Sequence, residues 1–115
     1  MNIKNVAIIL LFFSNYAYSA PPTIEEYQDN NDIEAHNIYI YGLERGLEWA
    51  NEYMFQKHSI EIYCKPSDLS LSSKQLRKII DKAIQANVTF YAKYKSAPLV
   101  GLALRNGYID AFPCN

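Results

Sequence analysis

The chain has 115 residues, a formal net charge of -1, 50% hydrophobic residues and 20% charged residues. This length suits one globular domain and excludes most multi-domain enzymes. A chain without a surplus of lysine and arginine is also poorly suited to coat nucleic acid, because neutralising phosphates requires such a surplus.

The first 19 residues have the pattern of an export signal. After a single cation comes the unbroken apolar run Val6–Phe13, and the small residues Ala17 and Ser19 stand at the positions that a signal peptidase inspects. We predict cleavage after Ser19, which leaves a soluble periplasmic or secreted domain over residues 20–115. The alternative is a transmembrane anchor, but the apolar run is about half of the roughly twenty residues that a spanning helix needs.

The mature chain is predicted to begin with a long helix. Residues 20–31 are expected to form a frayed lead-in, because two consecutive prolines cannot lie inside a helix. From about Asp32 to His58, apolar residues recur every three or four positions, which predicts one helix. These residues are Ile33, His36, Ile40, Leu43, Leu47, Ala50 and Met54. Gly42 and Gly46 lie beside this stripe and favour close packing, in the core or at a dimer seam, over a ligand cradle.

A connection over residues 59–70 is followed by a second predicted helix. Ser72 and Gln75 fit a capping box, with Ser70 as the rival cap. The apolar stripe of this helix is Leu76, Ile79, Ile80, Ala83 and Ile84. Residues 87–95 have a strand-like composition, but one short strand has no partner, so we predict an aromatic-rich loop or a helix extension.

The last predicted helix starts at Ser96 as its cap, with Pro98 in the first turn. It is apolar on most sides, so we expect it to be the most buried helix. The residues that make it so are Leu99, Val100, Leu102, Ala103, Leu104, Tyr108 and Ile109.

Cys64 and Cys114 are the two cysteines of the chain. In an exported protein an even pair predicts a disulfide rather than a free catalytic thiol. The bridge would close a loop of about 50 residues and tie the tail to the turn after the first helix. The sequence therefore predicts an all-α fold, a small single-domain helical bundle with one disulfide.

The residues capable of chemistry do not form the pattern of an enzyme. His36 and His58 have no further ligand at zinc spacing, so we expect no metal and no other cofactor. The sequence contains no glycine-rich phosphate loop and no nucleophile elbow. Glu44, Glu48 and Glu52 recur every four residues, as on a solvated acidic face, whereas a glycosidase needs two carboxylates across a cleft. We therefore expect a protein that is not an enzyme.

The two halves of the chain carry opposite charge. This asymmetry favours docking to another protein or to a second copy, because complementary potentials steer encounter. Alternatively, the first helix lies against the second and the charges meet at the rim. The acidic set is Glu25, Glu26, Asp29, Asp32, Glu34, Glu44, Glu48, Glu52 and Glu61, and the basic set is Lys65, Lys74, Arg77, Lys78, Lys82, Lys93, Lys95 and Arg105.

Candidate partner contacts combine the aromatic and charged residue types that dominate interface energetics. One group lies in residues 87–95, where the two tyrosines are expected to resist complete burial. The other lies on the first helix, where Trp49 could equally serve the core. The candidates are Tyr91, Lys93, Tyr94, Arg45, Trp49, Glu52 and Tyr53.

Several short motifs resemble one known family. They are Tyr41-Gly42 with Gly46, Tyr63-Cys64-Lys65-Pro66, the segment Leu71–Ile80, Ala97-Pro98-Leu99-Val100 with Ala103-Leu104, and Phe112-Pro113-Cys114. Together they resemble the Tai/Rap family of type VI secretion amidase-immunity proteins over most of the mature chain. The chain departs from the family at Ser72-Ser73, where a glycine often follows the leading leucine, and in residues 87–95.

The resemblance implies a small helical periplasmic protein, commonly dimeric, that binds and blocks a peptidoglycan amidase delivered by neighbouring bacteria. We expect residues 87–95 to plug the amidase cleft and the acidic side of the first helix to steer the encounter. The expected partners are this amidase and a second copy, with no nucleic acid and no membrane after signal cleavage. The alternatives are a periplasmic self-associating structural or chaperone-like module and an inhibitor of another cell-wall hydrolase.

Overall fold

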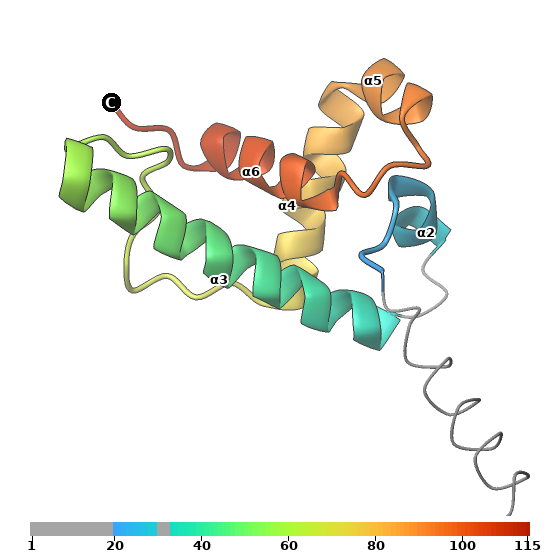
Figure 1. Ribbon diagram of the computed structural model, residues 1–115, viewed down its shortest axis with the longest axis horizontal. Helices are drawn as coiled ribbons and strands as arrows, with labels where there is room; N and C mark the ends of the chain where they lie inside the picture. The colour runs from blue at the N-terminus through green and yellow to red at the C-terminus, as the bar shows by residue number, and fades with distance from the viewer. Residues whose placement is uncertain (1–19, 30–32) are drawn as a thin grey trace, which may run out of the picture.

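The computed structural model describes residues 20–29 and 33–115, so the predicted signal peptide and the predicted helix start at Asp32 lie outside the described residues. The described helices are α2 (Ile24–Asp29), α3 (Ile33–His58), α4 (Ser73–Ala86), α5 (Val88–Lys93) and α6 (Val100–Ala111) (Figure 1). This part of the chain contains no strand. The prediction of an all-α fold is confirmed.

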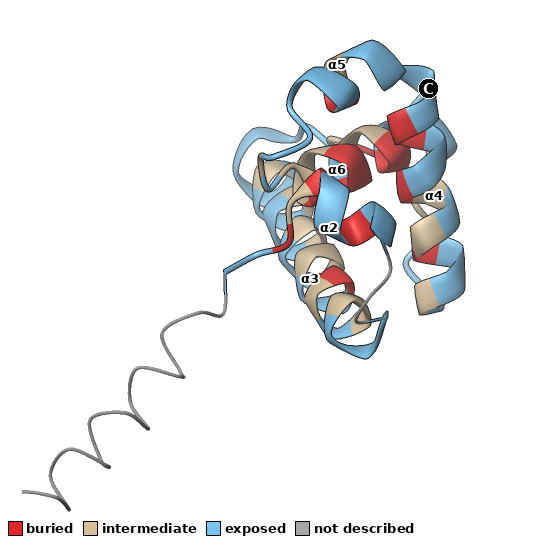
Figure 2. Ribbon diagram, turned by 90° about the vertical axis from the view of Figure 1, so that its right-hand side faces the viewer, coloured by how far each residue is buried: buried red, intermediate tan, exposed pale blue. Residues whose placement is uncertain are grey.

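Helix α6 is the central element. It contacts both α3 and α4, and buried positions gather where these helices meet (Figure 2). Five of its residues are buried: Val100, Ala103, Leu104, Gly107 and Tyr108. A Cβ atom on Gly107 would lie 2.5 Å from Cγ2 of Ile79 and 2.9 Å from its carbonyl oxygen, so the approach of α6 to α4 requires glycine. The last helix is the most buried, as its composition predicts.

Helix α3 packs through only part of the predicted stripe. Ile40 is fully buried, and Leu43 and Leu47 pack against the core. Ile33 is 54% exposed and Ala50 is also exposed, so these two positions are not core residues. Helix α3 extends past α6 at both ends, which leaves part of its apolar stripe uncovered (Figure 1).

The end of α3 at His58 agrees with the prediction. The next residue, Ser59, takes a left-handed conformation with φ 53°, and the backbone N–H of Ile60 donates to the carbonyl of Met54 at 3.5 Å. The chain then turns back onto α3, where Asn51 Oδ1 accepts hydrogen bonds from the N–H groups of Ile62 at 2.5 Å and the following residue at 3.4 Å. The connection is thereby held against the helix that it leaves.

The predicted lead-in over residues 20–31 is wrong, because it contains α2. Thr23 and Glu26 form a capping box: the Thr23 hydroxyl accepts from the N–H of Glu26 at 3.1 Å, and the Glu26 carboxylate accepts from the N–H of Thr23 at 3.3 Å. Ile24 and Tyr27 are buried, and the N–H of Ile24 donates to the carbonyl of Ala97 at 3.1 Å. Helix α2 is therefore docked on the connection between α5 and α6.

The predicted caps of the later helices have different outcomes. Ser72 caps α4 as predicted, since its hydroxyl accepts from Gln75 N–H at 3.2 Å and its own N–H donates to the Gln75 side chain at 2.8 Å. The predicted cap at Ser96 is wrong. Helix α6 begins at Val100, and Pro98 precedes it, because residues 94–97 form a turn that ends α5.

The predicted disulfide is confirmed: Cys64 and Cys114 are joined, 50 positions apart. The backbone N–H of Cys64 also donates to the carbonyl of Phe112 at 2.8 Å. The C-terminal tail is therefore held to the connection after α3 by a covalent bond and a hydrogen bond.

Candidate functional site

A lysine is enclosed between α3 and the connection that follows it. The side chain of Lys65 is 4% exposed, and its Nζ lies 3.1 Å from Oε1 of Glu48. The same ammonium group donates to the carbonyl oxygens of Leu69 at 2.5 Å and Pro66 at 3.3 Å. Because one cation holds a helix carboxylate and two loop carbonyls, it fixes the connection on α3.

Two tyrosines and a second carboxylate extend this group. The Tyr108 hydroxyl donates to Oε1 of Glu44 at 3.3 Å, and the rings of Tyr63 and Tyr108 pack edge to face at 4.9 Å. Burial, followed by the negative charges of Glu48 and Glu44, raises the pKa of Tyr63. We call Glu44, Glu48, Tyr63, Lys65 and Tyr108 the polar cluster. The charged groups and the Tyr108 hydroxyl engage one another, which is typical of a structural network, whereas Tyr63 joins through its ring and its buried hydroxyl has no hydrogen-bond partner among the described residues.

The predicted solvated acidic face on α3 is wrong for two of its three members. Glu44 and Glu48 are half-buried, and only Glu52 is exposed. The cause is tertiary: the returning connection and α6 cover this side of α3, and they bring Lys65 and Tyr108 to the carboxylates.

Stability should depend on pH through Glu44. Burial first and the charge of Glu48 second raise its pKa, while Tyr108 and Lys65 partly oppose this. A carboxyl group with a raised folded-state pKa stabilises the fold below its unfolded pKa of about 4.3, and this contribution is lost as the pH rises through the folded value. We expect Glu44→Gln to raise the free energy of unfolding at neutral pH by about 0.2–0.5 kcal/mol or more, the cost of a like-charge pair four residues apart.

Urea unfolding of the protein at pH 5 and pH 7 measures this effect. The matched control is Glu52→Gln, because Glu52 lies on the same helix but is exposed. An equal gain for both variants at pH 7 would assign the effect to net charge and contradict the role of Glu44.

The first predicted group of partner contacts lies on α5 and its following turn. Tyr91 is 2% exposed and packs edge to face on Phe90 at 5.1 Å, so the expectation that it resists burial is wrong. Tyr94 is 44% exposed, and its ring lies 5.4 Å from Nζ of Lys93. Lys93 and Lys95 are both exposed. The free surface here, the α5 tip, consists of Val88, Lys93, Tyr94 and Lys95.

The second predicted group lies on the outward side of α3. Trp49 is 63% exposed and Tyr53 57% exposed, so neither serves the core of the described chain. Arg45 and Glu52 are also exposed. All four predicted residues of this group are therefore available at the surface.

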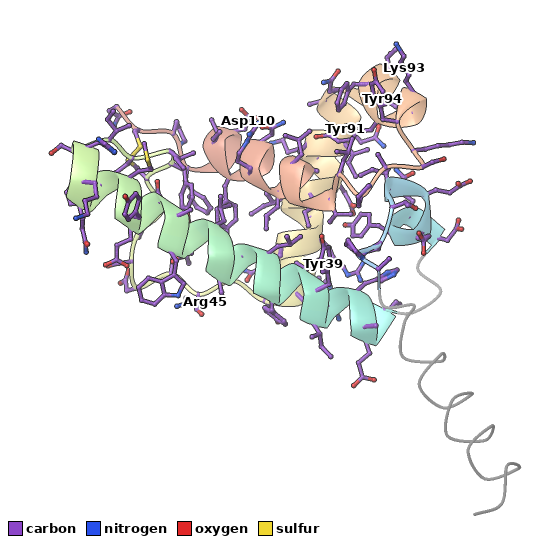
Figure 3. All side chains as sticks on the ribbon, viewed as in Figure 1. Tyr39, Arg45, Tyr91, Lys93, Tyr94 and Asp110 are labelled. Atoms are coloured by element: carbon purple, nitrogen blue, oxygen red, sulfur yellow. A yellow bond between two sulfur atoms is a disulfide. The ribbon has the colours of Figure 1, made fainter. Side chains whose placement is uncertain are left out.

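The two groups do not meet. Figure 3 shows Lys93 and Tyr94 on α5 at one end of the molecule, whereas Arg45 lies on the side of α3 that faces away from α6. One compact partner contact cannot use both groups, so the structure separates them into two surfaces.

Part of the predicted charge asymmetry is used inside the chain. Two ion pairs among the described residues join an acid of the first half to a base of the second: Glu48 with Lys65, and Glu25 with Lys95 at 3.9 Å. Acids and bases of the two halves thus meet within one molecule, although neither of these two pairs joins α3 to α4.

A polar contact between α2 and α4 was not predicted. The Tyr27 hydroxyl donates to Oδ1 of Asp81 at 2.7 Å, and the Arg77 guanidinium lies 5.2 Å from the Tyr27 ring centroid while its Nε donates to Asn37 Oδ1 at 2.8 Å. An open cavity of about 350 Å³ lies beside these residues. The capping box that precedes Tyr27 is the sequence signal that could have indicated a docked helix here.

The histidines and cysteines lie at separate places. His36 is half-buried and His58 ends α3, exposed. Glu61 lies within 4.8 Å of the ligand atoms of Cys64 and Cys114, but the two sulfur atoms are bonded to each other. A thiolate metal site would therefore require reduction of the disulfide.

The fold and its surfaces define a small helical protein stapled by a disulfide, with an aromatic and cationic tip and an exposed aromatic helix face. No described helix is long and apolar enough to cross a membrane. Comparison of the chain with known proteins finds no matching family model, no matching curated protein and no matching solved structure.

Proposed function

We propose that this protein is a periplasmic immunity protein that binds and blocks a peptidoglycan amidase of a type VI secretion system. The observation that carries the proposal is the pairing of the two most specific motifs of the resemblance, Tyr63–Pro66 and Phe112–Cys114. Their cysteines are 50 positions apart, and the disulfide joins them. A disulfide is also compatible with an oxidising compartment such as the periplasm. In this proposal the protein performs no catalysis.

The α5 tip is the surface that we assign to the amidase. It is short, it protrudes (Figure 1), and it places exposed Tyr94 next to Lys93 and Lys95, with exposed Val88 at the start of α5. Buried Tyr91 anchors it to the core, so the tip is ordered before binding. Preorganisation lowers the entropic cost of association, which suits an element inserted into a Cys–His cleft.

We expect Tyr94→Ala to weaken binding to the amidase at least tenfold, since lost aromatic anchors have effects of this size. Lys93→Glu should also weaken binding. This loss of affinity should be larger at low salt than at high salt, because salt screens exposed charges. Titration calorimetry with the purified product of the neighbouring gene, the candidate amidase, measures both effects. Lys78→Glu is the control, because it makes the same charge change at an exposed position of α4. Unchanged affinity of both α5-tip variants would show that the amidase binds another surface.

The function itself is tested in cells. The product of the neighbouring gene is exported to the periplasm, with and without co-export of this protein. Survival that depends on this protein supports immunity. Lysis despite an exported, disulfide-bonded protein would contradict it.

A second candidate function is a self-associating helical module that inhibits nothing. The observation that favours it is the exposed aromatic face of α3, which the α5-tip proposal does not use. Self-association without any protection in the survival experiment would favour this candidate.

A further inference from the structure

A buried tyrosine hydroxyl on α5 has no hydrogen-bond partner within the described chain. Tyr91 is 2% exposed, and its Oη atom is bonded neither to the described backbone nor to a described side chain. A buried polar group without a partner lowers the stability of the fold. Phenylalanine would fill the same space without this cost, so packing alone does not explain a tyrosine at this position.

This tyrosine lines an open cavity between the last turns of α4 and α6. Figure 3 shows Tyr91 and Asp110 on the side of α6 that faces away from α3. Although Tyr91 belongs to α5, Asn106 and Arg105 of α6 influence the ionisation of its hydroxyl, so the hydroxyl lies on the α6 side. The cavity has a volume of about 230 Å³, and its lining residues are Ala83, Ala86, Asn87, Tyr91, Asn106, Ile109 and Asp110.

The inner end of the cavity offers hydrogen-bond donors. Asn106 Oδ1 already accepts from Nε of Arg105 at 3.3 Å and from its Nη2 at 3.1 Å, so the Asn106 side chain has only its NH2 group left to engage a ligand. This side chain lies near the Tyr91 hydroxyl, without the geometry of a hydrogen bond. Burial raises the pKa of Tyr91, whereas Asn106 and then the charge of Arg105 lower it. Both groups therefore stabilise negative charge at this end of the cavity.

The outer end of the cavity favours positive charge. The Asp110 carboxylate is exposed and forms no hydrogen bond or ion pair with another described residue. Lys82 shares a smaller neighbouring cavity of about 90 Å³ with Asp110, but the two side chains are not paired. Neither α4 nor α6 has a basic residue in its last turn, whereas α3 and α5 have one. The negative ends of two helix dipoles therefore add to the charge of Asp110.

We propose that this cavity binds a free α-amino acid with a small apolar side chain. The ligand carboxylate accepts hydrogen bonds from the Tyr91 hydroxyl and the Asn106 NH2 group, and the ligand ammonium group donates to the Asp110 carboxylate. Asn106 and Asp110 are four residues apart on α6, so their Cβ atoms lie about 5–6 Å from each other, a gap that one zwitterion can bridge. Hydrogen bonds to an ionised group are stronger than neutral ones, which favours the zwitterion over a neutral ligand.

The size and the walls of the cavity select the ligand side chain. Sites for drug-sized ligands have volumes of about 300–1,000 Å³, so a cavity of about 230 Å³ suits a smaller molecule. The remaining walls are Ala83, Ala86 and Ile109, which offer an apolar surface to a methyl group. Alanine therefore matches the cavity. The site does not depend on the proposed inhibition of an amidase, because it uses none of the α5-tip residues.

NMR titration of the disulfide-bonded protein with L-alanine and, separately, with D-alanine tests the proposal without any enzyme. We expect saturable amide shifts in residues 83–91 and 106–110 for at least one enantiomer, with a millimolar or tighter dissociation constant. Propionate lacks the ammonium group and ethylamine lacks the carboxylate, so each should bind at least tenfold more weakly. Binding of either compound as tightly as alanine, or no saturable shift at tens of millimolar alanine, would overturn the proposal.

Two variants test the assigned contacts. Tyr91→Phe keeps the ring that packs on Phe90, so it should weaken alanine binding at least tenfold while the melting temperature of the ligand-free protein stays equal or rises. Asp110→Asn should also weaken binding at least tenfold, because the ammonium group loses its charged partner. Tyr53→Phe and Asp68→Asn are the matched controls, since they make the same changes at exposed positions elsewhere. A lower melting temperature of Tyr91→Phe would assign the hydroxyl to the fold, and unchanged binding by both cavity variants would place alanine elsewhere; either result contradicts the proposal.

Discussion

Replacing both Cys64 and Cys114 by alanine should remove about 4 kcal/mol from the free energy of unfolding, because the disulfide closes a 50-residue loop in the unfolded chain. Small domains are stable by about 5–15 kcal/mol in total, so this loss is a large fraction. The hydrogen bond from Cys64 to Phe112 cannot hold the tail alone at comparable strength.

Urea unfolding with and without a reductant separates the bridge from the side chains. The wild-type protein should lose stability in reductant, whereas the double alanine variant should not respond to it. If reductant lowers the free energy of unfolding by less than about 1 kcal/mol, the reduced chain keeps the tail in place. Loop entropy would then not be the main contribution of the disulfide to stability.

Elements with a strong local signal could be predicted from the sequence. The capping box at Ser72 and Gln75, the long apolar periodicity of α3 and the cysteine pair all agree with the structure. Each depends on residues close in sequence or, for the cysteines, on a pairing with one solution. Helix α2 also had a local signal, Thr23 with Glu26, which two preceding prolines obscured.

Features that arise from packing between distant segments could not be predicted in this way. The spacing of Glu44, Glu48 and Glu52 is the same whether the helix side is solvated or covered. Only the return of the connection with Lys65 and the position of Tyr108 distinguish these cases. The same limit applies to Tyr91, whose burial is set by how α5 folds back on the core.

The site predictions show the same division. The sequence did not decide whether Trp49 lies in the core or on the surface, because the predicted helix carries apolar residues on several faces. The structure exposes it together with Tyr53, Arg45 and Glu52. Of the two packing alternatives for Gly42 and Gly46, the core is wrong, because a Cβ atom on either glycine would meet nothing within 4 Å.

Lys65→Met should destabilise the fold by about 3–5 kcal/mol, the range for removing one partner of a buried ion pair. The ammonium group is the cation that holds Glu48 and two loop carbonyls. Without it, half-buried Glu48 and Glu44 face each other uncompensated beside Tyr63. Thermal and urea unfolding measure the loss, and Lys95→Met is the control, because its pair with Glu25 is exposed on both sides and should contribute less than about 1 kcal/mol.

The double variant Lys65→Met with Glu48→Gln decides whether the ion pair or the lysine packing matters. If the uncompensated charge is the main cost, the double variant should be more stable than Lys65→Met alone, since neutral glutamine no longer needs a cation. If the double variant loses as much or more, the loop depends on the hydrogen bonds from lysine to the carbonyls of Pro66 and Leu69. The Lys65 between the cysteine and the proline would then fix the connection through the backbone, and Glu48 would serve to balance its charge.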